Sequence, residues 1–211
     1  MIIEDKVDFK MSTEEKILQA AETEFMNKGF DGARTTAIAE AAGVTHAMFH
    51  YYFRTKKNLF ERIVTEKIKA LQQLVAKALV HNDKPLFERI ASVISEHLDF
   101  LCANPNLPRF LIMEMYTDKE RMDIFLSKLH VLADSVVNGL QDEINRKADE
   151  GICKRIDARI LILDILSLNM FSFIAAPVCN ILLDDLAVNL KEFVEIRKRE
   201  NIETITRKLM P

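Results

Sequence analysis

Two histidines that stand four residues apart are the side chains of this sequence best placed to do chemistry together. His46 and His50 share one face if this stretch is a helix. Two imidazoles at that spacing can hold a metal ion, but no third His, Cys or carboxylate lies close by in the sequence, so we expect no metal or other cofactor. Imidazoles can also form hydrogen bonds with base edges in the major groove of DNA. We interpret both histidines as DNA-facing groups, and two surface histidines are the alternative.

The residues around the histidines predict two short helices joined at one glycine. Thr35 is the expected N-cap of the first helix, and Gly43 ends it because glycine takes a left-handed conformation without steric cost. Thr45 is the expected N-cap of the second helix, which runs to Tyr52. One face of this second helix is predicted to pack inward and carries Phe49, Tyr52 and Phe53. The opposite face stays free and carries His46, Ala47, His50 and Tyr51.

The order of residues in this region resembles the TetR family of bacterial transcriptional regulators. The resemblance rests on Ile38-Ala39-x-x-Ala42-Gly43-Val44-Thr45, followed by Tyr52-Phe53-x-x-Lys56 and Leu59. It covers roughly residues 12–63, about a quarter of the chain. The resemblance implies a helix-turn-helix whose second helix enters the major groove of double-stranded DNA.

Positions that usually contact DNA in this family fall on the second helix and on Lys56. Two departures occur: His50 stands where tyrosine is most frequent, and Arg34 stands where a capping threonine is usual, so Thr35 or Thr36 takes the capping and phosphate role. Tyr51 and Lys56 suit phosphate oxygens, although a core aromatic pair and a solvated lysine are the alternative for Tyr51, Tyr52 and Lys56. The predicted DNA contacts are Thr35, Thr36, Thr45, His46, Ala47, Met48, His50, Tyr51, Tyr52 and Lys56.

The composition predicts an all-α fold of about nine helices. Of 211 residues, 49% are hydrophobic and only five are Gly and five Pro, which favours helices around a sizeable core. We expect a flexible tail over residues 1–11, a three-helix helix-turn-helix domain over residues 12–60 and a helical ligand-binding and dimerisation domain over residues 61–211. The net charge of −3 means that any nucleic-acid contact must be local. Three cysteines without metal-ligand spacing and no secretory signal indicate the cytoplasm.

A long apolar run from residue 160 to residue 183 could be a membrane span or a buried helix. Asp164, Asn169, Pro177 and Asn180 interrupt it, which argues against a span. A helix that is apolar all round must be buried all round, and a second copy of the chain would cover one side most simply. The family resemblance likewise implies dimerisation through the last two long helices. We predict a homodimer that pairs through residues 157–175 and 188–209, with no membrane partner.

The second domain contains a region rich in methionine and phenylalanine. Such side chains can line an adaptable apolar pocket, and ordinary core packing is the alternative. The predicted pocket for a small apolar ligand lies near Phe110, Met113 and Phe125. Glu96-His97 and Glu114 could be named as an acid–base pair, but the sequence contains no catalytic motif, so we expect no enzyme.

These observations predict a DNA-binding transcriptional regulator, in particular a repressor that binds a palindromic operator as a dimer and is released by a small molecule. The alternative is a helical ligand-binding or scaffold protein whose helix-turn-helix engages a protein partner. Salt dependence separates the two, because phosphate contacts make DNA affinity fall steeply with salt.

Overall fold

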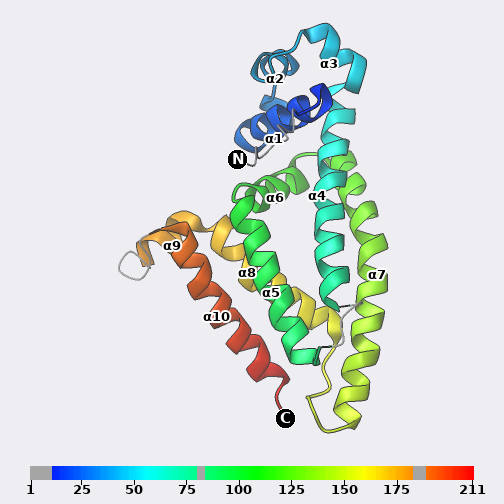
Figure 1. Ribbon diagram of the computed structural model, residues 1–211, viewed down its shortest axis with the longest axis vertical. Helices are drawn as coiled ribbons and strands as arrows, with labels where there is room; N and C mark the ends of the chain where they lie inside the picture. Colours follow the sequence, from blue (N-terminus) through cyan, green and yellow to red (C-terminus); the bar gives the residue numbers. More distant parts are fainter. Residues whose placement is uncertain (1–10, 80–83, 183–188) are drawn as a thin grey trace, which may run out of the picture. The chain divides into compact units, whose positions relative to one another are not determined.

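The computed structural model describes residues 11–79, 84–182 and 189–211, and ten helices lie within them (Figure 1). The prediction of an all-α fold is confirmed. The helices in chain order are α1 (Thr13–Gly32), α2 (Thr35–Ala41), α3 (His46–Phe53), α4 (Lys56–Leu79), α5 (Leu86–Ala103), α6 (Leu107–Thr117), α7 (Lys119–Asp149), α8 (Ala158–Ile174), α9 (Ala176–Leu182) and α10 (Leu190–Leu209).

The chain divides into two compact units, Met1–Val64 and Thr65–Pro211. The division falls inside α4, so the first turns of this helix belong to one unit and the remainder to the other. Thr55 begins α4, because its hydroxyl accepts a hydrogen bond from the Asn58 backbone N–H at 3.1 Å. One helix therefore carries the chain from the first unit into the second without a break.

The first unit is a three-helix arrangement closed by the start of α4. A capping box begins α1: the Ser12 hydroxyl accepts from the Glu15 backbone N–H, and the Glu15 carboxylate accepts from the Ser12 N–H. Phe25, Phe30 and Phe60 form an aromatic cluster with ring centroids 5.2–5.8 Å apart. This core holds α1 against the elements that follow and gives α2 and α3 a rigid support.

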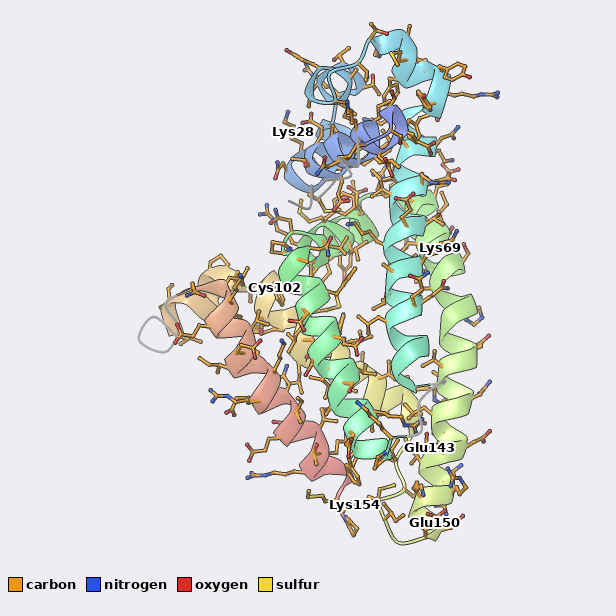
Figure 2. The ribbon with its side chains drawn as sticks, viewed as in Figure 1. Lys28, Lys69, Cys102, Glu143, Glu150 and Lys154 are labelled. Carbon is orange, nitrogen blue, oxygen red and sulfur yellow. The ribbon has the colours of Figure 1, made fainter. Side chains whose placement is uncertain are left out.

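The second unit is a helical bundle in which α10 packs against α5 and α8, and α7 packs against α8 (Figure 1). Arg89 of α5 and Glu143 of α7 form an ion pair between two largely buried side chains; Glu143 lies in the C-terminal part of α7 (Figure 2). The main apolar core is formed by residues including Ile94, Leu98, Ile144, Leu161, Ile205 and Leu209. Burial of these side chains supplies the main driving force for folding of this unit.

Helix α8 has two different apolar faces. The inner face carries Ala158, Leu161 and Ile165, which are buried, whereas Ile160, Leu163 and Phe171 are 50–61% exposed. One apolar face of α8 is therefore uncovered in the single chain, and its burial by a second copy stays a prediction. The sequence of α8 does not indicate which face is buried within the chain, since both faces are apolar. The positions of α5, α7 and α10 determine it.

Helix α9 accounts for the difference between the nine helices predicted and the ten described. Pro177 stands at the second position of α9, where its missing N–H leaves no bond unmade. The apolar run beyond residue 160 is thus divided between two helices. Among the described residues, no helix is long and apolar enough to cross a membrane.

Candidate nucleic-acid interface and apolar cavity

The turn between α2 and α3 is a Schellman motif centred on Gly43. The Gly43 N–H donates to the Glu40 carbonyl and the Val44 N–H donates to the Ala39 carbonyl, both at 3.0 Å. Gly43 has φ 68°, which is the left-handed conformation that the sequence predicted. The two hydrogen bonds end α2 sharply and fix the direction in which the chain enters α3.

Thr45 begins α3, as predicted, with its hydroxyl accepting a hydrogen bond from the Met48 N–H at 3.2 Å. Phe49 and Phe53 are buried and anchor one face. Tyr52 is 40% exposed at the edge of that face, while Tyr51 is 81% exposed on the other. The face that also carries His46, Ala47, Met48 and His50 is open to solvent. A two-turn helix thus presents polar, aromatic and small apolar groups on a firmly held support.

Thr35 is the first residue of α2 and not its N-cap. Arg34 occupies the N-cap position and makes no side-chain capping bond. The Thr35 hydroxyl instead shares a hydrogen bond with His46 Nε2 at 3.1 Å, which joins the start of α2 to the start of α3. The expected capping by Thr35 is therefore wrong, because His46 of α3 competes for the hydroxyl. Thr36 is exposed beside it.

His50 is oriented by the backbone that follows α3. Its Nδ1 lies 2.9 Å from the Arg54 carbonyl oxygen, and a carbonyl can only accept, so Nδ1 carries the proton of this bond. In the neutral ring Nε2 is then an acceptor. The His46 and His50 rings meet edge to face with centroids 4.4 Å apart. The two histidines form one small polar cluster on the exposed face.

Lys56 has partners within the first unit that the sequence did not indicate. Its Nζ donates to the Phe30 carbonyl at 2.8 Å and to the Ala33 carbonyl at 3.0 Å, and lies 4.5 Å from the centroid of the Phe30 ring. The side chain is half-buried. Lys56 thus ties the end of α1 to the start of α4, a structural role that would position α3 even without a contact to phosphate.

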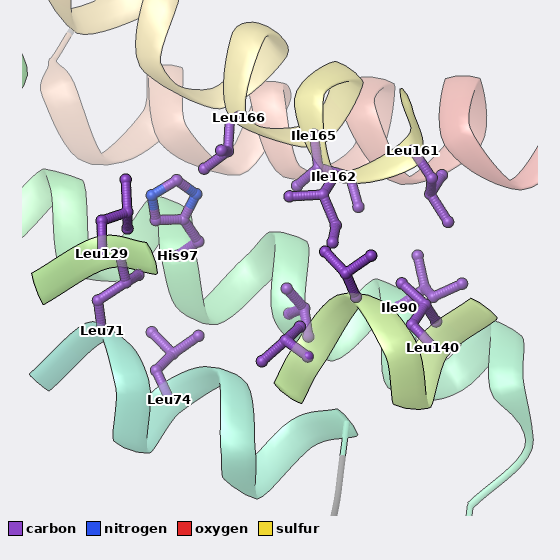
Figure 3. A pocket seen from close by; sticks show the side chains of 13 residues that line it. Leu71, Leu74, Ile90, His97, Leu129, Leu140, Leu161, Ile162, Ile165 and Leu166 are labelled. Atoms are coloured by element: carbon purple, nitrogen blue, oxygen red, sulfur yellow. The ribbon is translucent and has the colours of Figure 1, made fainter. Parts of the chain in front are cut away.

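An apolar cavity of about 180 Å³ lies in the second unit (Figure 3). It is bounded by the second half of α4 and by α5, α7 and α8. Of the lining residues that the structure describes, twelve are aliphatic and the thirteenth is His97. These residues are Leu71, Leu74, Ile90, Val93, His97, Leu129, Val136, Val137, Leu140, Leu161, Ile162, Ile165 and Leu166.

The predicted pocket residues lie elsewhere. Phe110, Met113 and Phe125 do not line this cavity; Phe110 is a buried side chain of α6, and Met113 is 52% exposed. The described lining residues of the cavity are leucine, isoleucine, valine and His97, with no methionine or phenylalanine, so a ligand site near Phe110, Met113 and Phe125 stays a separate prediction. Glu114, which the sequence singled out, forms a buried ion pair with Arg121 in which Nε and Oε2 are 2.8 Å apart.

Among the described residues that line the cavity, His97 has the one polar side chain, and it belongs to a buried hydrogen-bond chain. Its Nδ1 lies 3.1 Å from Asn169 Nδ2, and Asn201 Nδ2 donates to Asn169 Oδ1 at 2.8 Å. His97 and both asparagines are at most 5% exposed. Burial disfavours the charged imidazolium and lowers the pKa of His97 to about 4, so the ring is neutral at neutral pH. The chain connects α5, α8 and α10.

Comparison with known proteins identifies the first unit. Residues 17–63 match the family of bacterial regulatory proteins described as the tetR family, and this segment contains the Schellman turn and α3. This segment of the chain belongs to the TetR family. The expectation that the protein is not an enzyme accords with this family of regulators.

Similarity to known proteins extends beyond the first unit. The chain is 29% identical over 124 residues to the Probable HTH-type transcriptional regulator YttP of Bacillus subtilis, across 56% of this chain and 60% of that protein. The chain thus spans about three fifths of the length of this curated relative. The crystal structure of the TetR family regulator PfmR from Thermus thermophilus has a TM-score of 0.70 at 18% identity and covers 96% of this chain and 100% of that one.

A further solved structure is the regulator FadR of Bacillus subtilis in complex with stearoyl-CoA. It has a TM-score of 0.66 at 18% identity and covers 92% of this chain and 97% of that chain. At such identity the likeness establishes the fold of this TetR family protein. Both solved structures extend across its two units.

Proposed function

We propose that this protein is a cytoplasmic transcriptional regulator that binds double-stranded DNA through α3. The observation that carries the proposal is the α3 face held out by the Schellman turn, because a two-turn helix fixed in this way fits the major groove. In the sequence, the only charged residues from position 41 to position 60 are Arg54, Lys56 and Lys57, all basic. A local excess of positive charge favours phosphate contacts although the whole chain is acidic.

Different residues of the face are suited to different tasks. Tyr51, the most exposed, can donate its phenolic hydrogen to a phosphate oxygen, and Thr36 can do the same from the start of α2. Because Nδ1 of His50 bonds to the Arg54 carbonyl, the ring directs Nε2 to base edges, and the Nε2 lone pair would accept from the amino groups of adenine or cytosine in the major groove. Ala47 and Met48 suit thymine methyl groups. We therefore assign the contact with the DNA backbone, which positions the protein, to Tyr51, and base recognition to His50.

The experiment first selects bound fragments from random DNA and then compares variants on the selected site and on random DNA. His50→Ala should weaken binding to the selected site by about 1–3 kcal/mol and leave random DNA nearly unaffected. Tyr51→Ala should weaken both about equally. Wild-type affinity should fall steeply as salt rises. Binding that ignores salt, or equal losses for His50→Ala on both DNAs, would instead favour the alternative of a protein partner for α3.

We propose in addition that the protein acts as a homodimer paired through α8 and the region of α10. Ile160, Leu163 and Phe171 are exposed at intervals of three and eight residues along α8, and Val178, Ile181 and Leu182 of α9 are also exposed. An apolar surface of this kind is rarely left open to water. In a two-fold dimer the two copies of α3 would lie about 34 Å apart and reach successive major grooves of a palindromic operator.

Leu163 is a sharper probe of the dimer than its neighbour Leu166, because Leu166 lines the cavity. Leu163→Glu should give monomers in sedimentation and lose binding to a two-half-site DNA. Asn138→Glu adds the same charge at an exposed position of α7 and serves as the control. If Leu163→Glu sediments as a soluble dimer with wild-type helicity, this face does not pair.

We propose further that DNA binding is repressive and is released by a small apolar ligand in the cavity. Leu71 and Leu74 of α4 line the cavity, and α4 continues into the first unit. The FadR structure with stearoyl-CoA supports ligand binding by a protein of this fold. Val137→Phe should fill the cavity and abolish release by compounds found in a screen with labelled operator. Met113→Trp lies outside the cavity and should respond like wild type.

A further inference from the structure

The cavity excludes charged ligands by its chemistry. The walls come from α4, α5, α7 and α8, and their described residues supply no ion-pair partner for a carboxylate, phosphate or ammonium group. Burial of an unpaired charge among such residues is strongly unfavourable. The volume of about 180 Å³ suits a small molecule, since an apolar cavity of about 150 Å³ stays dry and takes up benzene. The body of any ligand must therefore be apolar and compact.

The hydrogen bonds of Asn169 determine which nitrogen of His97 carries the proton. The Asn169 amide group donates one hydrogen to the Ile94 carbonyl at 3.2 Å and the other to His97 Nδ1. Its Oδ1 accepts from Asn201. This arrangement uses every group of the amide, and the reverse orientation would set two oxygens against each other at Ile94. His97 Nδ1 is therefore an acceptor, and the neutral ring carries its proton on Nε2.

These hydrogen bonds leave the Nε2–H group of His97 without a partner. Within the described residues it has no hydrogen-bond partner, although the side chain is only 5% exposed. In Figure 3 the His97 ring lies between Leu71, Leu129 and Leu166 at one end of the cavity. A water molecule there would find few other polar groups, and ordered buried waters usually need two or more. An acceptor on a ligand can meet this N–H without requiring further polar partners.

We propose that the cavity binds a small, uncharged, mainly apolar molecule with one hydrogen-bond acceptor, which accepts the Nε2–H of His97. Carbonyl compounds such as ketones and esters belong to this class, whereas carboxylates and amines do not. The proposal rests on the ligand-binding part of the proposed function and specifies it. His97 is the specificity-determining residue, and Asn169, held by Asn201, is its positioning residue.

The experiment uses three probes of similar size on the full-length protein without DNA. Acetophenone has one carbonyl acceptor, ethylbenzene has the same shape without it, and benzoate is charged. Calorimetry gives each Kd for wild type and for His97→Phe, which keeps a flat ring but no donor. The ratio of the ethylbenzene Kd to the acetophenone Kd should fall about tenfold in the variant, the effect of one buried hydrogen bond. His130→Phe makes the same substitution at an exposed histidine of α7 outside the cavity and should leave this ratio unchanged.

A measurement on the wild-type protein keeps the test valid if His97→Phe does not fold. In a ¹H–¹⁵N spectrum of the imidazole rings near pH 5, His97 is recognised as a ring that is still neutral, because burial lowers its pKa to about 4. Its pattern should be that of the Nε2–H form. Acetophenone should shift the Nε2–H signal, and ethylbenzene should leave it in place.

Three results would overturn the proposal: an Nδ1–H tautomer for His97, benzoate binding as tightly as acetophenone, or a Kd ratio that His97→Phe does not change. Failure of all three probes to bind would also overturn it. None of these outcomes bears on DNA binding by α3, which is measured without ligand. Conversely, loss of DNA binding by wild type would refute the regulator proposal and leave the cavity result intact.

Discussion

Acidification should destabilise the second unit through His97. The folded protein holds this ring neutral, with a pKa of about 4, whereas in the unfolded chain the ring has its ordinary pKa of 6.5. The unfolded state therefore binds a proton at a higher pH than the folded state does. Stability that depends on neutral His97 is complete above pH 6.5, declines as the pH falls below that value, and is fully lost below about pH 4.

The size of the effect follows from the difference between the two pKa values. One pKa unit corresponds to about 1.4 kcal/mol, so the full loss is about 3 kcal/mol. Between about pH 7.5 and about pH 5 the linkage relation gives a loss of about 2 kcal/mol. This is a large fraction of the typical stability of a domain, about 5–15 kcal/mol. Carboxylates also titrate over part of this range, so the loss must be measured against a variant without the imidazole.

Urea unfolding followed by far-ultraviolet circular dichroism suits the protein, because it contains no tryptophan. The free energy of unfolding is compared at the two pH values for wild type and His97→Phe at one protein concentration. The variant should lose about 2 kcal/mol less than wild type. His130→Gln removes an exposed histidine that lies 3.8 Å from Asp134 and should behave like wild type. Equal pH dependence in wild type and His97→Phe would refute the buried neutral state.

Three further predictions concern the first unit, each read by thermal unfolding and DNA affinity. Gly43→Val should lower the free energy of unfolding by about 1–2 kcal/mol through backbone strain alone, because φ is 68° and an added Cβ would meet no atom within 4 Å. Gly43→Asn should lower it less, since asparagine tolerates this conformation better; an equal loss for both variants would contradict the strain argument. Thr45→Ala should cost about 1 kcal/mol through loss of the α3 cap, while Thr45→Ser should retain it. Lys56→Met should lower the free energy of unfolding by about 1–3 kcal/mol, because it removes the hydrogen bonds that Lys56 donates to the Phe30 and Ala33 carbonyls. The salt dependence of DNA binding should stay unchanged; a salt slope lower by about one unit would point to a phosphate contact.

Local signals in the sequence determined the elements of the first unit. The capping box at Ser12, the glycine at position 43 and the cap at Thr45 each act within about five residues along the chain, and all three are present in the structure. Such short-range interactions depend on residue type and spacing, which the sequence displays directly. The buried and exposed faces of α3 followed from helical periodicity for the same reason.

Interactions between distant segments could not be predicted in the same way. Lys56 meets the carbonyl of a residue 26 positions earlier, and Thr35 meets His46 across the turn. Each contact forms only when one helix is packed against another, and neither residue type indicates in the sequence which partner it will have. As a result, the DNA contacts expected of Thr35 and Lys56 from their positions in the sequence must be tested by experiment, because both side chains already have hydrogen-bond partners in the folded chain.

The second unit shows most clearly which features cannot be predicted from the sequence. The sequence determined that its helices are rich in leucine and isoleucine, but not which side chains leave a space between α4, α5, α7 and α8. His97, Asn169 and Asn201 are separated by 72 and 32 residues, yet together they fix one proton at the cavity. An isolated histidine on an apolar helix carries no sign of such a role. Only the packing of α5, α8 and α10 decides it, because burial and hydrogen-bond partners are properties of the folded chain.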